Sequence, residues 1–233
     1  MKKILFFLVL SSLLCISCHN RSGETAEVIK NAVTDVDGNR YDAVKIGNQV
    51  WMASNLKTTH YPNGDTIHLP SPELSELHDD VRVPPAGNMD NVEVYGYLYS
   101  YSAATRACPE GWHLPDGKEW YDMEQAIINN EKYLEKSTTV AKALASEEHW
   151  NQVSDFGGAG FQPSTNNSTG FSALPASYIG SVNPIGDLAA FWTTEITASG
   201  RVISRFISAH ESSLKVGSQI PSEDALSVRC VKD

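Results

Sequence analysis

Four cysteines are the residues whose chemistry this sequence constrains most, because a thiol can carry a lipid or form a disulfide. Cys15 and Cys18 lie close together near the N-terminus, at the end of an apolar segment. Cys108 and Cys230 lie more than a hundred residues apart in the rest of the chain. The two pairs therefore predict two kinds of chemistry, attachment to a membrane and covalent closure of a domain.

The first residues are typical of an export signal. A basic start, Met1–Lys3, precedes an apolar run over residues 4–14, which is too short for the roughly 20 residues that span a bilayer. The following Cys-Ile-Ser-Cys resembles a bacterial lipobox, although Cys15 stands where Leu is usual. We expect residues 1–17 to be a lipoprotein signal peptide and Cys18 to carry the lipid. The alternative is an ordinary secreted protein that is cleaved nearby.

Removal of the signal and acylation of Cys18 leave Cys108 and Cys230 as the remaining thiols. An oxidising compartment favours their pairing. A crosslink that closes so long a loop stabilises a domain by roughly 4–5 kcal/mol in the chain-entropy treatment. Two buried free thiols are the alternative.

The net charge of the chain limits the classes of partner that it can bind. Lys and Arg number 18 against 28 Asp and Glu, which gives a net charge of −10. Nucleic-acid binding requires basic side chains that neutralise phosphates, so we expect no nucleic-acid partner. No second long apolar run occurs in the sequence, so the lipid anchor is the expected membrane contact.

The rest of the chain reads as a tether over residues 18–32 and one domain over residues 33–233. Asp37-Gly38 and Gly47-Asn48 favour tight turns, which predicts a three-stranded meander over residues 33–36, 40–46 and 49–51. Residues 35–39 also imitate the start of a calcium loop. Such a loop requires Glu at its twelfth position, where this chain has Ile46.

Further elements follow along the chain, and together they predict an α+β fold. Asp116 and Glu119 have the spacing of a capping box, with Trp120, Met123 and Ile127 on one face of the helix that follows. The expected helices cover residues 102–107, 116–129 and 138–147, and the expected strands cover residues 94–101, 190–196, 202–209 and 225–231.

Catalytic motifs are scarce, and we expect neither a cofactor nor a metal. The sequence has no Gly-x-Ser-x-Gly, no His-Glu-x-x-His and no phosphate loop. His60, His68 and His78 are too widely spaced for a zinc site on one helix. His113 is expected to pack or to hydrogen-bond beside the start of the capped helix. A distant pair of carboxylates would escape detection, so an enzyme stays one hypothesis.

A long irregular stretch over residues 155–187 is the predicted place for a ligand, because binding residues concentrate on loops. Amides and carboxylates can bond sugar hydroxyls, and a tyrosine ring can stack on a sugar face. The alternative is an ordinary solvated loop. The candidate ligand residues are Asn166, Asn167, Tyr178, Asn183 and Asp187.

Several sequence blocks, in order, resemble the Fibrobacter succinogenes major paralogous domain of Bacteroidetes lipoproteins and surface proteins. The resemblance covers roughly residues 33–233 and implies a cell-envelope protein, attached to the outer membrane on a face left undecided. The matching blocks are DGNRY (37–41), KIGNQVWMASNL (45–56), YGYLY (95–99), CPEGWHLP (108–115), GFSALP (170–175), FWTT (191–194) and SVRCVK (227–232).

The order of elements is also similar to the C-type-lectin-like fold, on which formylglycine-generating enzymes are built. That resemblance implies an N-terminal β-hairpin meander, two to three short helices, a long loop region and closing antiparallel strands. The chain lacks the calcium-binding tripeptides of such lectins and a reactive cysteine pair. Three functions are therefore weighed: a noncatalytic binding domain for glycan or protein ligands, a structural or adhesive component of a surface assembly, and an enzyme with an unrecognised carboxylate site.

Overall fold

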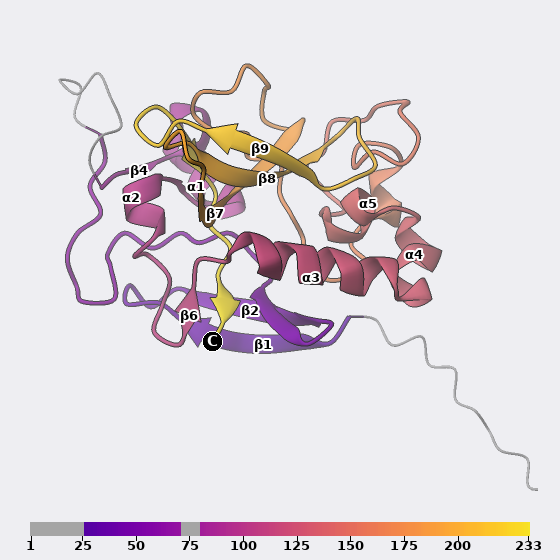
Figure 1. Ribbon diagram of the computed structural model, residues 1–233, viewed down its shortest axis with the longest axis horizontal. Helices are drawn as coiled ribbons and strands as arrows, with labels where there is room; N and C mark the ends of the chain where they lie inside the picture. Colours follow the sequence, from indigo (N-terminus) through magenta and orange to yellow (C-terminus); the bar gives the residue numbers. More distant parts are fainter. Residues whose placement is uncertain (1–25, 71–79) are drawn as a thin grey trace, which may run out of the picture.

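The computed structural model describes residues 26–70 and 80–233 (Figure 1). The predicted signal peptide, the predicted lipidation site Cys18 and His78 lie outside these residues. The described chain combines helices with antiparallel sheets, which confirms the α+β prediction.

The strands form three sheets. In spatial order, the first sheet contains β1 (Val28–Thr34), β2 (Arg40–Ile46), β3 (Gln49–Met52), β11 (Val231–Lys232) and β6 (Trp112–His113). The second contains, also in spatial order, β10 (Ala225–Leu226), β5 (Leu98–Ser100) and β4 (Arg82–Val83). The third contains β7 (Leu188–Ile196), β8 (Val202–Ser208) and β9 (Lys215–Gln219), with β8 in the middle.

The helices are short, apart from one. They are α1 (Val92–Tyr95), α2 (Tyr101–Ala104), α3 (Gly117–Ile128), α4 (Glu131–Ser137) and α5 (Val140–Leu144). Three single 3₁₀ turns lie at Pro85–Gly87, Met89–Asn91 and Pro163–Thr165.

The predicted meander is present as β1, β2 and β3, in antiparallel pairing. Its first turn is held by Asp35, whose carboxylate accepts the backbone N–H groups of Asp37 and Asn39 and, at 2.5 Å, the hydroxyl of Tyr41. The carboxylate therefore organises a turn, as the hairpin interpretation requires. Strand β1 begins at Val28 rather than at residue 33. Its first residues were not predicted because Val28 and Ile29 are followed by the polar Lys30 and Asn31, so no apolar alternation marks this part of the strand.

Helix α3 is capped as the spacing predicted. The Asp116 side chain accepts the Glu119 N–H at 2.7 Å, and the Glu119 carboxylate accepts the Asp116 N–H at 2.9 Å. Its buried residue Trp120 packs against Trp51 of β3 and Phe191 of β7, with ring centroids 4.9 and 5.5 Å apart. Helix α3 thus fills the space between the first and third sheets (Figure 1).

The predicted strand over residues 94–101 is wrong in its first half. Tyr95 ends helix α1, and β5 begins only at Leu98. Gly96 separates the two elements at φ 73°, and a Cβ there would lie 2.6 Å from the Leu56 carbonyl oxygen. Glycine is therefore needed for both the conformation and the close approach, and alternating tyrosines alone do not make a strand.

Other boundaries also differ from the sequence prediction. Helix α5 is shorter than predicted, since Ala145 leaves the helix and forms a bridge with Ala173. The predicted last strand is split into β10 and β11, and helix α4 and strand β9 were missed. Strand β9 lies at the edge of its sheet and contains Gly217 and an exposed Val216, so it lacks the apolar alternation that reveals a strand.

Arg229 is fully buried between the first sheet and the loop that precedes β7. Its guanidinium donates to Asn55 Oδ1 at 2.7 Å and to the carbonyls of Met52, Phe171 and Ser172. The cation lies 4.4 Å from the centre of the Phe171 ring. Burial lowers the pKa of Arg229 to about 9, which still leaves the side chain charged at neutral pH. One cation therefore joins three segments that are distant in the sequence.

Candidate functional site

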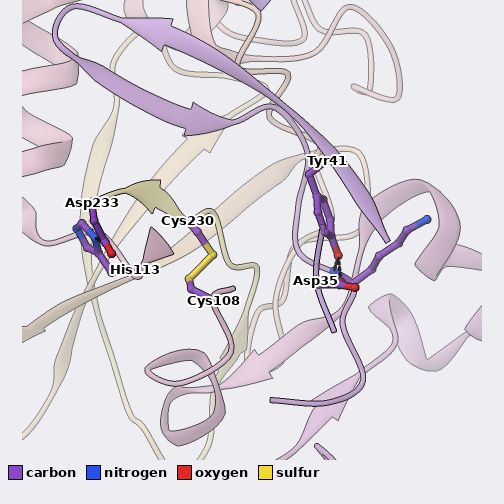
Figure 2. The surroundings of a disulfide bond; sticks show 7 residues. Asp35, Tyr41, Cys108, His113, Cys230 and Asp233 are labelled. Atoms are coloured by element: carbon purple, nitrogen blue, oxygen red, sulfur yellow. Dashed lines mark hydrogen bonds and ion pairs between the residues drawn. A yellow bond between two sulfur atoms is a disulfide. The ribbon is translucent and has the colours of Figure 1, made fainter. Parts of the chain in front are cut away.

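The predicted disulfide is present and closes the domain. Cys108 and Cys230 are joined with their Cα atoms 5.9 Å apart, at a sequence separation of 122 (Figure 2). The bond links the segment after α2 to the segment just before β11. Cys230 is fully buried, so this pair forms a structural crosslink rather than a reactive thiol site.

His113 hydrogen-bonds beside the start of α3, as the sequence predicted. Its Nδ1 lies 2.6 Å from Asp233 Oδ1 (Figure 2), and its Nε2 lies 2.8 Å from Glu119 Oε1. Burial lowers the pKa of His113, but the bonds to Asp233 and Glu119 outweigh it and hold that pKa above its ordinary value. Because both nitrogens are hydrogen-bonded, the ring links β6 to α3 and to Asp233, the residue after β11.

His60 pairs with Asp37 beside a pocket of about 280 Å³ near the disulfide. Burial raises the pKa of Asp37, but hydrogen bonds from the Thr59 backbone, His60, Thr58 and the Thr59 hydroxyl outweigh it and bring that pKa to about 2. Within residues 26–70 and 80–233, no group of three or more His, Cys, Asp or Glu side chains is arranged to hold a metal ion. The pair anchors the loop after β3 to the first hairpin.

A larger hollow lies between the segment after α5 and the first part of the long loop, and we call it the loop pocket. Its volume is about 630 Å³, within the range of small-molecule sites. Val153 N–H bonds to the Gly160 carbonyl at 3.1 Å, which joins its two walls. The lining residues are Glu147, Glu148, His149, Trp150, Gln152, Val153, Gly160, Phe161, Gln162, Pro163 and Ser164.

The loop pocket combines polar groups with aromatic surface. Glu147 forms an ion pair with Lys136 at 2.5 Å. The Glu148 side chain is 84% exposed and has no lysine or arginine partner among the described residues. Gln152 contributes an exposed amide. Amides and carboxylates are suited to hydroxyl groups of a ligand.

The aromatic part of the loop pocket comes from two loops. Trp150 is buried, and its Nε1 donates to Ser146 Oγ at 3.1 Å. The half-buried Phe161 ring lies 5.4 Å from the ring of Phe156, which is 78% exposed on the same loop. An exposed aromatic ring beside a polar hollow offers an apolar surface to a ligand.

The candidate ligand residues divide between the interior and the surface. Asn166 is fully buried, and its amide donates to the carbonyls of Ser146 and Ala159 at 2.9 Å each. Asn167 bonds to Ser172 through both its amide nitrogen and its carbonyl oxygen. These two asparagines therefore shape the loop from within.

Tyr178 and Asn183 are brought together at a second, smaller hollow of about 230 Å³. Tyr178 packs against Phe206 of β8, with ring centroids 5.7 Å apart. Asp187 lies beside this hollow and accepts the Asn151 side-chain amide at 2.8 Å.

Asn151 connects the loop pocket to the smaller hollow. Its neighbours Trp150 and Gln152 line the loop pocket, while Asn151 itself bonds to the Gly186 carbonyl through its N–H and to Asp187. Gly186 adopts φ 103°, and a Cβ there would lie 2.6 Å from the Asn151 side chain. The long loop is thereby held against the segment after α5.

Sequence reasoning missed the wall of the loop pocket formed by residues 147–153. These residues precede the long irregular stretch, and the predicted helix extends as far as Glu147. One signal in the sequence could have indicated this wall. A large aromatic residue, Trp150, stands among the polar residues Glu148, His149 and Gln152, with neither helical nor strand periodicity.

In the described part of the chain, no helix is both long and apolar enough to cross a bilayer.

The family model for the Fibrobacter succinogenes major domain matches residues 44–232. Neither a curated protein nor a solved structure matches the chain. The C-type-lectin-like resemblance therefore stays a prediction.

Proposed function

Since this chain belongs to the Fibrobacter succinogenes major domain family, we propose that it is a cell-envelope lipoprotein whose domain binds a neutral glycan, without catalysis, in the loop pocket. The observation that carries the proposal is the combination of amide, carboxylate and aromatic side chains in one hollow of ligand size. The pocket is built on loops that buried groups hold in place, as is usual for binding sites.

The charge of the pocket supports a neutral ligand rather than an acidic one. Glu148 is not paired with a lysine or arginine among the described residues, and Glu147 is already neutralised by Lys136. The chain as a whole carries a net charge of −10. An anionic polysaccharide would meet repulsion at the pocket and over the whole surface.

We expect simultaneous Glu148→Ala and Gln152→Ala substitutions to weaken glycan binding at least tenfold. Each lost hydrogen bond contributes about 0.5–1.5 kcal/mol, more when the acceptor is charged, and about 1.4 kcal/mol is a factor of ten in affinity. Both side chains are exposed, so the melting temperature should change little. Glycan-array screening of the full-length protein in detergent, followed by calorimetry, measures the effect.

Gln125→Ala with Glu135→Ala is the matched control, since both residues lie on helices outside the pocket. The control should bind as the unmodified protein does. Undiminished binding in the pocket variant would place the site elsewhere. Loss of binding in Tyr178→Ala alone would assign the ligand to the smaller hollow.

We also propose that Cys18 carries the lipid that attaches the protein to the outer membrane, on its periplasmic or its extracellular face. Cys18→Ala should release the protein from the membrane fraction or leave the precursor uncut, because multiple acyl chains make such anchoring durable. Fractionation and intact-mass measurement test this. Membrane retention with a normally processed N-terminus in the variant would refute the assignment.

A structural or adhesive role in a surface assembly is the second candidate, and the sheet edges favour it. Strands β1 and β9 each have a sheet neighbour on one side only, among the described residues, and Val28, Ile29 and Val216 are exposed there. Unpaired edges can accept a strand from another chain. Co-purification of a stoichiometric envelope protein, with no glycan bound on the array, would favour this role.

A further inference from the structure

Lys142 is a buried cation beneath the loop pocket. Its side chain is among the largest fully buried ones, and the residue is 1% exposed. The ammonium donates to the Phe161 carbonyl and, at 3.2 Å, to the Gln162 carbonyl. None of the described carboxylates lies within ion-pair distance of it, so backbone carbonyls and the Phe161 ring, 5.9 Å away, compensate the charge.

The two carbonyls that Lys142 binds belong to a strained part of the pocket wall. Gln162 has φ 46°, in the left-handed region that residues with a Cβ rarely adopt. Pro163 follows directly, and a residue before proline prefers an extended backbone. Such a conformation persists only where the surroundings enforce it.

The side chains of Phe161 and Gln162 line the loop pocket on the other side of this backbone. Helix α5, which carries Lys142, is itself fixed by a Thr139 cap and by its packing in the core. A rigid donor thus reaches from the core to a strained stretch of the pocket wall.

From this geometry we propose that Lys142 is a positioning residue that holds the Phe161–Gln162 wall in its strained conformation and keeps the loop pocket preformed. The inference rests on the proposed function only in taking the pocket as the binding site. The clamp itself is a property of the unliganded protein, and it can be tested without a ligand.

The test is amide hydrogen exchange in the full-length protein carrying Lys142→Met, which keeps the apolar stem but removes the donors. We expect at least tenfold faster exchange over residues 160–166, where Gly160, Phe161, Thr165 and Asn166 N–H groups make backbone hydrogen bonds. Helix α3 should exchange as before. Lys30→Met, on the exposed edge strand β1, is the control and should change neither region.

Unchanged exchange over residues 160–166 would overturn the proposal, and so would equal acceleration in α3, which reports global destabilisation. A second variant, Gln162→Gly, separates strain from simple packing, because glycine adopts the left-handed conformation freely. In that background, Lys142→Met should accelerate exchange less than threefold. An undiminished acceleration would mean that Lys142 supports the wall without opposing strain, contrary to the proposal.

Glycan binding provides a second, independent test of the role of Lys142. Lys142→Met should weaken binding of the glycan that the unmodified protein selects on an array at least tenfold. If the unmodified protein binds no glycan, the proposed function fails while the exchange result still decides the role of Lys142. If it binds one and Lys142→Met binds equally well, the positioning role is refuted although the function holds.

Discussion

Replacing both Cys108 and Cys230 with alanine should lower the free energy of unfolding by about 4–5 kcal/mol, because the crosslink closes a loop with a sequence separation of 122. Both ends of that loop belong to the core, since Cys230 is fully buried and Cys108 packs against the same cluster. A loss of this size is a large fraction of the stability of an ordinary domain. Denaturant titration of the oxidised protein and the variant measures it.

Mass spectrometry of proteolytic peptides should find Cys108 and Cys230 linked in native protein purified without reductant. The double serine variant is the matched comparison, since it keeps the side-chain size and also lacks the bond. A loss below about 1 kcal/mol, within the scatter of surface substitutions, would contradict the prediction. Two free thiols in the native protein would contradict it outright.

Arg229→Met should cost about 3–5 kcal/mol of stability. Its guanidinium is the donor to Asn55 Oδ1 and to the carbonyls of Met52, Phe171 and Ser172. Each buried acceptor that loses its partner costs about 1–3 kcal/mol, while removal of a desolvated cation offsets part of that loss.

Arg229→Lys distinguishes geometry from charge, because a compact ammonium lacks the planar fork with which the guanidinium reaches acceptors in two separate segments. It should recover only part of the stability. Arg40→Met, on the surface of β2, is the control and should change the free energy of unfolding by less than about 0.5 kcal/mol. Equal stability of Arg229→Met and the unmodified protein would show that the network contributes nothing net.

The parts of the fold that local rules determine were predictable from the sequence. Asp37-Gly38 and Gly47-Asn48 marked two real turns, and the spacing of Asp116 and Glu119 marked a real capping box. Strand β9 escaped because an exposed edge strand has no apolar face. Helix α4 escaped because its residues are almost all exposed or only half-buried.

The candidate site was predictable only as a region. The long loop does line both hollows, but residues 147–153 enter the loop pocket through tertiary contacts that no local pattern reveals. Asn166 and Asp187 looked like surface ligands by composition, yet one amide is buried and one carboxylate holds Asn151. Burial of Lys142 and Arg229 was equally hidden, since charged residues are assigned to the surface by default.

Strand β11 joins β3 to β6 in the first sheet, although it follows every other described element in the sequence. A ribosome makes β3 first and completes β11 on the order of 10 to 40 s later, at about 5–20 residues per second. During that interval the edge of β3 that carries Trp51 lacks its partner strand, and the Cys108 thiol has no Cys230 to pair with. The nascent chain is thus unable to close its main sheet until its synthesis has passed Lys232.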